Sequence, residues 1–240
     1  MRLGVRAPQS EGRMAVMKGM KGTFALLLAL SCCGAAWGEA RQRSPYDNIN
    51  TPFYQIKTSI YQSMPRREGS IVFLGDSLTD YIPFHELFPG LPVLNRAIAG
   101  DSTVGVLTRL NEVISLKPAK LFLLIGCNDI VFNLTADETA ANIRQIVARF
   151  REGSPNTRIY LETVLPVNHQ FETNRPDEAI RAINVRLAKL AEELGLPLID
   201  TYAHFAENGE LPLRYTVDGI HLNGAGVLRR VEFLSKWIEM

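Results

Sequence analysis

Two short motifs, far apart in the sequence, carry residue types that together can transfer an acyl group. Ser77 follows an apolar run and a glycine, and His221 stands three positions after Asp218. On a tight turn, an aspartate at this spacing can accept the Nδ1–H of the imidazole, which leaves Nε2 free to take a proton from a serine hydroxyl. Each motif is weak alone, because Ser77 also suits a helix N-cap and Asp-x-x-His is more often a pair at a helix start.

Two further polar motifs follow apolar runs that lie between these residues. Gly100 comes after the run at 92–95, and Asn128 comes after the run at 120–125. If the runs are parallel strands, their carboxyl ends share one edge of the sheet, and the motifs converge there with Ser77. Asn128 also fits a turn and Gly100 a backbone position with positive φ. Four such motifs in this order are nevertheless hard to reach by accident.

The elements that must position these motifs alternate between apolar strands and amphipathic helices. Thr135-x-x-Glu138 is a capping box, Asp101 or Ser102 caps another helix, and Gly195 stops a third. The order predicts an α/β fold, a three-layer doubly wound sandwich with a five-stranded parallel sheet in the flavodoxin-like order 2-1-3-4-5. We expect strands at 70–74, 92–95, 120–125, 158–165 and 196–200, and helices at 54–64, 83–88, 102–116, 135–150, 176–194 and 223–238.

Composition excludes some classes of function. The chain has 240 residues and a formal net charge of +1, but residues 39–240 hold 21 basic and 24 acidic side chains. A mildly acidic body lacks the concentrated basic face that nucleic acid requires, so we expect no nucleic-acid partner. There is no HExxH, no paired CxxC and no histidine cluster, so no metal and no other cofactor is expected.

The first residues have the order of an export signal. A basic start is followed by the apolar run 24–30, which is too short to span a bilayer, and then by small residues up to Gly38. We interpret 1–38 as a signal peptide, 39–65 as a linker and helix, and 66–240 as the catalytic domain. The protein is then exported, to the periplasm or outside the cell, and has no membrane span. A lipid anchor at Cys32 or Cys33 is the alternative.

Taken together, the motifs resemble those of the SGNH hydrolases, the GDSL-type esterase family, over nearly all of residues 70–237. The blocks are Gly75-Asp76-Ser77-Leu78, a second centred on Gly100, Gly126-x-Asn128-Asp129, and Asp218-x-x-His221. The resemblance implies that Ser77 is the nucleophile, that His221 is the general base and then the general acid, and that Asp218 orients His221. It also implies an oxyanion hole formed by the backbone N–H groups of Ser77 and Gly100 and the side-chain amide of Asn128.

The sequence departs from the family pattern at two places. Ala97 and Ala99 stand where the second block commonly has glycines, and the variable position of the third block is Cys127. Neither change removes a reacting atom, so we interpret both as changes in packing. Cys127 is a competing nucleophile, but cysteine is among the most buried residue types, and we interpret it as structural.

The expected function is an exported serine esterase that removes short acyl groups, above all acetyl, from carbohydrates through an acyl-enzyme. A lysophospholipase or thioesterase would use the same catalytic set, and a non-catalytic glycan- or lipid-binding module is the alternative of another class. Two mostly polar loops are left to shape the pocket, and in them we expect Asn168, Arg175 and Arg214 to bind substrate.

Overall fold

Parallel strands alternate with helices along the chain in the computed structural model, which describes residues 43–239. Its sheet has the strand order β2-β1-β3-β4-β5, and every pair is parallel, which confirms the predicted fold and order. The strands are β1 (Ile71–Gly75), β2 (Val93–Asn95), β3 (Lys120–Leu124), β4 (Arg158–Glu162) and β5 (Leu198–Ile199). The helices are α1 (Pro52–Ser63), α2 (Ser77–Asp80), α3 (Phe84–Leu87), α4 (Thr103–Ile114), α5 (Cys127–Val131), α6 (Ala136–Gly153), α7 (Asp177–Leu194), α8 (Thr201–Phe205) and α9 (Gly224–Glu239), with a 3₁₀ turn at Leu213–Tyr215.

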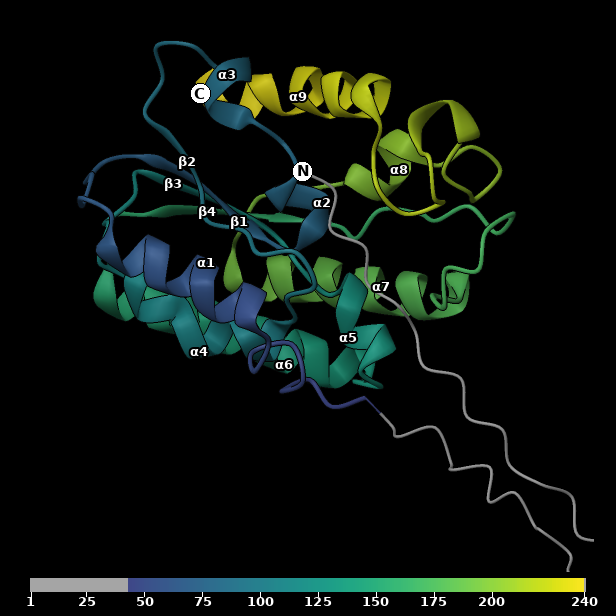
Figure 1. Cartoon of the computed structure of the whole chain (residues 1–240), viewed down its shortest axis with the longest axis horizontal. Coiled ribbons are helices and arrows are strands. Elements are labelled where there is room, and N and C mark those ends of the chain that lie inside the picture. Colours follow the sequence, from purple (N-terminus) through teal and green to yellow (C-terminus); the bar gives the residue numbers. More distant parts are fainter. Residues whose placement is uncertain (1–42, 240) are drawn as a thin grey trace, which may run out of the picture. The chain divides into compact units, whose positions relative to one another are not determined.

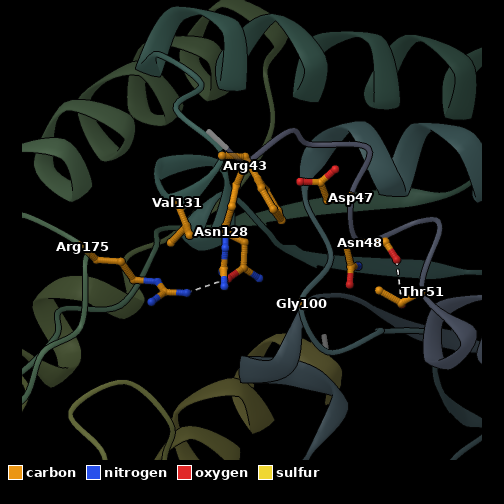
Figure 2. A pocket seen from close by; sticks show the side chains of 9 residues that line it. Arg43, Asp47, Asn48, Thr51, Gly100, Asn128, Val131 and Arg175 are labelled. Carbon is orange, nitrogen blue, oxygen red and sulfur yellow. Dashed lines mark hydrogen bonds between the residues drawn. The ribbon is translucent and has the colours of Figure 1, made fainter. Parts of the chain in front are cut away.

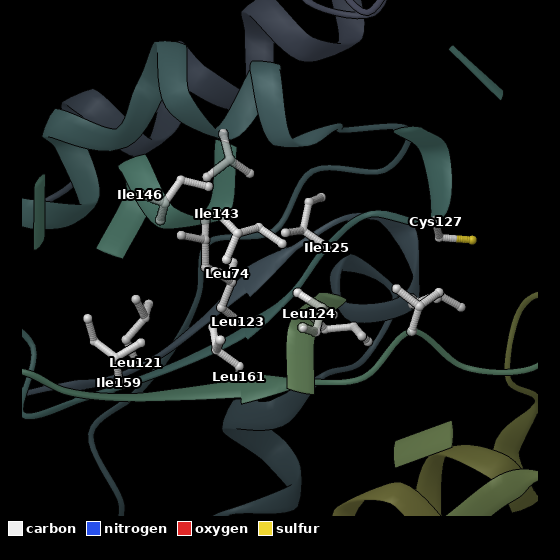
Figure 3. Close-up of a cluster of buried hydrophobic side chains, with 14 of the residues drawn as sticks. Leu74, Leu121, Leu123, Leu124, Ile125, Cys127, Ile143, Ile146, Ile159 and Leu161 are labelled. Atoms are coloured by element: carbon white, nitrogen blue, oxygen red, sulfur yellow. The ribbon is translucent and has the colours of Figure 1, made fainter. Parts of the chain in front are cut away.

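Helices cover both faces of the sheet, with α4, α6 and α7 on one side and α9 and α3 on the other (Figure 1). Successive side chains of a strand point to opposite faces, so each central strand supplies both layers. In β1, Val72 and Leu74 join the larger core cluster, drawn in part in Figure 3, while Ile71 and Phe73 join the smaller one under α9. This two-sided burial explains why β1 and β3 are apolar without alternation.

Local signals fix where the main helices begin and end. Ser102 caps α4 by accepting the Gly105 N–H, and Thr135 with Glu138 forms the predicted capping box at the start of α6. The C-cap of α7 is Gly195, in the left-handed conformation. These three sequence predictions are confirmed.

Strand β4 ends at Glu162, three residues before the predicted end. At Val164 a side chain, rather than a neighbouring strand, is the hydrogen-bond partner of the backbone. Val164 donates its N–H to Oδ1 of Asn184 at 2.7 Å and accepts from Nδ2 of the same side chain at 2.9 Å. Asn184 lies on α7, so this helix supplies hydrogen-bond partners to the backbone where strand pairing stops. The partner strand β5 is also shorter than predicted.

Helix α1 packs on α4 and on the loop that follows the edge strand β2. The Tyr54 hydroxyl donates to the Gly105 carbonyl at 2.7 Å, and the Tyr61 hydroxyl donates to the Ala97 carbonyl at 2.8 Å. Both rings are buried with Ile98 in a small cluster of their own. The N-terminal segment is thereby attached to the body close to Gly100.

A buried ion pair joins three elements behind the site. Arg230 of α9 is fully buried and donates from Nη2 to Oε2 of Glu162, at the end of β4, at 2.9 Å. Its Nη1 donates to the Leu78 carbonyl of α2 at 2.7 Å. One guanidinium therefore connects the helix that follows His221 with the short helix that carries Ser77.

Replacing Arg230 by methionine should destabilise the protein by about 3–5 kcal/mol, because Glu162 would remain buried without its partner. Urea unfolding at pH 7 measures the loss. The double variant Arg230→Met/Glu162→Gln should recover part of it, since the uncompensated charge is then gone. A single variant as stable as wild type would contradict this account.

Candidate active site

Ser77 is the first residue of α2, and only Asp76 separates it from the end of β1. Asp76 is the N-cap, and its Oδ1 accepts the Leu78 N–H at 3.0 Å, so the cap does not use the Ser77 side chain. Gly75 must be glycine, because a Cβ there would lie 2.1 Å from the Leu124 carbonyl oxygen of β3. The close approach of β1 and β3 therefore positions the turn that presents Ser77.

His221 and Asp218 reach Ser77 from the loop before α9. Nε2 of His221 lies 2.8 Å from the Ser77 Oγ, and Nδ1 lies 2.5 Å from Oδ2 of Asp218. The other Asp218 oxygen accepts the backbone N–H groups of Ile220 and His221. Burial raises the pKa of Asp218, but these hydrogen bonds outweigh it and hold the pKa below its ordinary value. The carboxylate is thus fixed as an anion next to Nδ1.

Gly100 lies at the third position of a tight turn after β2. The Asp101 N–H donates to the Ile98 carbonyl at 3.0 Å, and Gly100 has φ +80°, which favours glycine. Within residues 43–239, the backbone N–H groups of Ser77 and Gly100 donate to no protein acceptor. Both donors are left available for a ligand.

Asn128 is the third predicted donor and lies at the start of α5. Its Nδ2 donates to the Asp101 carbonyl at 2.9 Å, and its Oδ1 accepts from Nη2 of Arg175 at 2.7 Å. One Nδ2 hydrogen is left. The side chain is mostly buried and lines the same pocket as Gly100. A carbonyl oxygen bound there would meet preorganised donors.

Replacing Asn128 by alanine should lower kcat by roughly 10² to 10³ with little change in KM, because a donor aimed at an oxyanion acts mainly in the transition state. Steady-state kinetics with a short ester separates the two constants. An effect confined to KM would place Asn128 in substrate binding instead.

Carboxyl groups buried beneath the site have raised pKa values. Burial raises the pKa of Asp76 to about 7, and it raises the pKa of Asp101 to about 6 against the opposing effect of Arg109. Oδ2 of Asp76 is buried without a hydrogen-bond partner. The folded state therefore retains a proton on Asp76 at pH values where an unfolded chain has lost it.

This difference predicts how stability changes with pH. Between about pH 4 and pH 7 the folded state binds the extra proton, so Asp76 lowers the free energy of unfolding as pH rises, by at most about 1.4 kcal/mol per pH unit. Asp76→Asn keeps an oxygen for the Leu78 N–H and should flatten that slope. Urea unfolding of both proteins at pH 5, 6 and 7 compares the slopes. Equal slopes would show that Asp76 is ionised in the folded protein.

A pocket of about 340 Å³ opens beside Gly100 and Asn128 (Figure 2). One wall comes from the segment before α1, which the sequence predicted to be a linker. The lining residues are Arg43, Asp47, Asn48, Thr51, Gly100, Asn128, Val131, Phe132 and Arg175. Helix α1 also begins at Pro52 rather than at the predicted Tyr54, and Thr51-Pro52, an N-cap followed by proline, is the sequence signal for that earlier start.

The three residues predicted to bind substrate lie in different surroundings. Asn168 is buried, and its Nδ2 donates to the Leu211 carbonyl at 2.9 Å, so it joins two loops instead of facing a ligand. Arg214 is paired with Glu207 and lies outside the pocket lining. Arg175 does line the pocket.

The competing nucleophile is enclosed in the protein. Cys127 lies in the larger core cluster, and burial raises the pKa of its thiol to about 12. The thiol therefore stays protonated at neutral pH and is a poor nucleophile. Two other histidines contact neighbouring side chains. Nε2 of His169 lies 2.8 Å from Oδ1 of Asp177, and the His204 ring stacks on the Phe233 ring with 3.9 Å between the centroids.

Residues 43–239 contain neither a membrane-spanning helix nor a metal-binding cluster. In that part of the chain no helix is long and apolar enough to cross a membrane. The same residues hold no group of three or more acidic, histidine or cysteine side chains arranged to bind a metal ion. The predicted signal peptide, with Cys32 and Cys33, lies outside the described residues.

A serine in contact with an aspartate-oriented histidine, at the carboxyl edge of a doubly wound sheet, has the geometry that serine hydrolase chemistry requires. The model of the GDSL-like Lipase/Acylhydrolase family matches residues 73–228. The chain belongs to this family, as the motifs predicted, and is a carboxylic ester hydrolase.

The chain is similar to known proteins over most of their length. The chain is 31% identical over 169 residues to the human platelet-activating factor acetylhydrolase IB subunit alpha2, a match that covers 67% of this chain and 72% of that one. Among solved structures, a protein from Streptococcus pneumonia assigned as a platelet activating factor is 29% identical with a TM-score of 0.71, covering 77% and 92% of the two chains. A GDSL-like lipase from Bacteroides thetaiotaomicron is 25% identical with a TM-score of 0.67, covering 78% and 97%.

Proposed function

We propose that this chain hydrolyses short acyl esters, above all O-acetyl esters of carbohydrates, through a triad of Ser77, His221 and Asp218. The observation that carries the proposal is the 2.8 Å contact between the Ser77 Oγ and the His221 Nε2, with Nδ1 held by Asp218. This geometry suits removal of the serine proton during attack on a carbonyl carbon.

The proposed reaction has two halves. His221 takes the Ser77 proton as Oγ bonds to the ester carbon, and the carbonyl electron pair moves onto oxygen, which faces the Ser77, Gly100 and Asn128 donors. The bond to the alcohol then breaks, and His221 gives the proton to the leaving oxygen. In the second half, water loses a proton to His221 and attacks the acyl carbon. The bond from that carbon to Oγ then breaks, His221 returns the proton to Oγ, and the acid is released.

A short acyl group fits the lining of the pocket. Burying a further methylene gains about 0.8 kcal/mol only where an apolar surface receives it. Beside Gly100 and Asn128 the apolar side chains are Val131 and Phe132, and most of the other side chains in the lining are polar or charged. Two apolar side chains can receive only a few methylenes, which supports acetyl over long acyl groups.

An exposed aromatic ring supports a sugar on the alcohol side. Tyr81 is 62% exposed, and its ring centroid lies 5.2 Å from that of His221. The leaving alcohol must lie near His221, which protonates it, so Tyr81 offers an apolar ring face at that place. The second candidate is an acetylated lipid alcohol, because the relatives at 31% identity are named platelet-activating factor acetylhydrolases.

Substrate series separate these proposals. We expect p-nitrophenyl acetate to be hydrolysed much faster than the octanoate, and acetylated xylan to release acetate faster than a lysophospholipid is cleaved. A rate that climbs with chain length would overturn the short-acyl proposal. Preference for platelet-activating factor over acetylated glycans would retain the acetyl group and move the alcohol to the lipid candidate.

We also propose that the protein is exported, on the strength of residues 1–38. The mass of the protein purified from its own cells tests this. A chain that begins at Glu39 supports cleavage of a signal peptide, and a chain that begins at Cys32 or Cys33 with added lipid mass supports the lipoprotein alternative. A cytoplasmic protein that keeps residues 1–38 would contradict export.

A further inference from the structure

The amide of Asn128 is held from both sides. Its Oδ1 accepts from Nη2 of Arg175 at 2.7 Å, while Nδ2 donates to the Asp101 carbonyl at 2.9 Å (Figure 2 draws the Arg175 contact). A guanidinium has donors only, so the oxygen of the amide must face Arg175 and its nitrogen must face away. The contact thus decides which end of Asn128 can donate to a substrate.

Arg175 is itself fixed before any substrate arrives. Its Nε donates to the Cys127 carbonyl at 3.2 Å, and its Nη1 donates to the Thr173 carbonyl at 2.6 Å. All three guanidinium nitrogens, Nε, Nη1 and Nη2, therefore donate to protein acceptors. The side chain is partly buried, and it comes from the loop between β4 and α7, which is far from Asn128 in the sequence.

We propose that Arg175 is a positioning residue of the oxyanion hole, which acts on the reaction through the amide of Asn128. The proposal rests on the proposed function, because it assumes that Asn128 donates to the oxyanion. A charge-assisted hydrogen bond to Oδ1 prevents the amide from rotating and draws electron density toward the oxygen. The Nδ2–H group becomes a stronger donor and is already aligned when the carbonyl oxygen gains charge.

A direct substrate contact predicts a different kinetic result. If Arg175 binds substrate, removing it should raise KM and should matter only for substrates with a polar group that reaches it. If it acts through Asn128, kcat should fall even for phenyl acetate, whose only polar group is the ester. The loss should also disappear once Asn128 is gone, because residues that act through one contact are not additive.

The test is a double-mutant cycle of Arg175→Met and Asn128→Ala with phenyl acetate. We expect Arg175→Met to lower kcat by roughly tenfold or more with KM nearly unchanged, less than the 10² to 10³ expected for loss of the donor itself. In the Asn128→Ala background the same substitution should change kcat by less than about twofold. Equal losses in both backgrounds, or a loss confined to KM, would overturn the proposal.

Controls distinguish positioning from general damage. Arg175→Lys keeps the charge but replaces the planar fork by one ammonium, so it should recover part of the kcat loss. If Arg175→Met does not fold, the cycle is run with Arg175→Lys. Arg186→Gln removes an exposed arginine of α7 that is paired with Asp137, and it should leave kcat unchanged.

Ser77→Ala, measured in parallel, separates this proposal from the one on which it rests. If that variant still hydrolyses phenyl acetate at the wild-type rate, the proposed function fails. If it is inactive while the cycle is additive, only the role given to Arg175 fails.

Discussion

Replacing Ser77 by alanine should lower kcat by on the order of 10⁶, because the acyl-enzyme can no longer form. The substitution should leave the fold intact: the N-cap of α2 is Asp76, and the contact made by the Ser77 Oγ is with His221. A loss of this size is therefore chemical rather than structural. Steady-state kinetics with p-nitrophenyl acetate measures it, after thermal melting has shown that the variant is as stable as wild type.

Cys127→Ala is the matched control for this prediction. The thiol is the other nucleophile near the site, but it is buried, and its pKa of about 12 keeps it protonated. We expect this variant to retain most of the activity. Near-normal turnover by Ser77→Ala would refute the serine mechanism, and a simultaneous loss in Cys127→Ala would transfer the nucleophile to the thiol.

Much of the fold follows from signals that are local in the sequence. Strands β1 and β3 are apolar on both faces because helices cover both sides, and Thr135 with Glu138 caps α6 through neighbours three residues apart. Given alternating strands and helices, right-handed crossovers leave few arrangements of the sheet. The convergence of Ser77, Gly100 and Asn128 at one edge was predictable for the same reason.

What the sequence did not reveal depends on contacts between distant segments. Nothing local indicates that the residues before α1 line the pocket beside Gly100, since Tyr54 and Tyr61 attach that segment through carbonyls far along the chain. Asn168 is a polar loop residue of the kind that often binds ligands, but its side chain donates a hydrogen bond to the Leu211 carbonyl. Its polarity predicted that it forms hydrogen bonds but did not identify the partner.

Asp218→Asn should lower kcat by about 10⁴, the loss seen when a triad histidine is held in the wrong tautomer. The structure explains why the asparagine would adopt the harmful orientation. Oδ1 of Asp218 accepts the Ile220 N–H at 3.0 Å and the His221 N–H at 2.8 Å, so the amide oxygen of asparagine would occupy that place. Its NH₂ group would then face Nδ1 of His221 and donate to it.

With Nδ1 accepting a hydrogen bond, the imidazole must carry its proton on Nε2, the atom that faces the Ser77 Oγ at 2.8 Å. That nitrogen can then no longer take the serine proton. The turn itself should survive, because the backbone N–H groups keep their acceptor, and the melting temperature should stay near that of wild type. Activity within tenfold of wild type would show that Asp218 only shapes the turn. A loss of about 10⁴ without a loss of stability would show that its charge and orientation set the tautomer of His221.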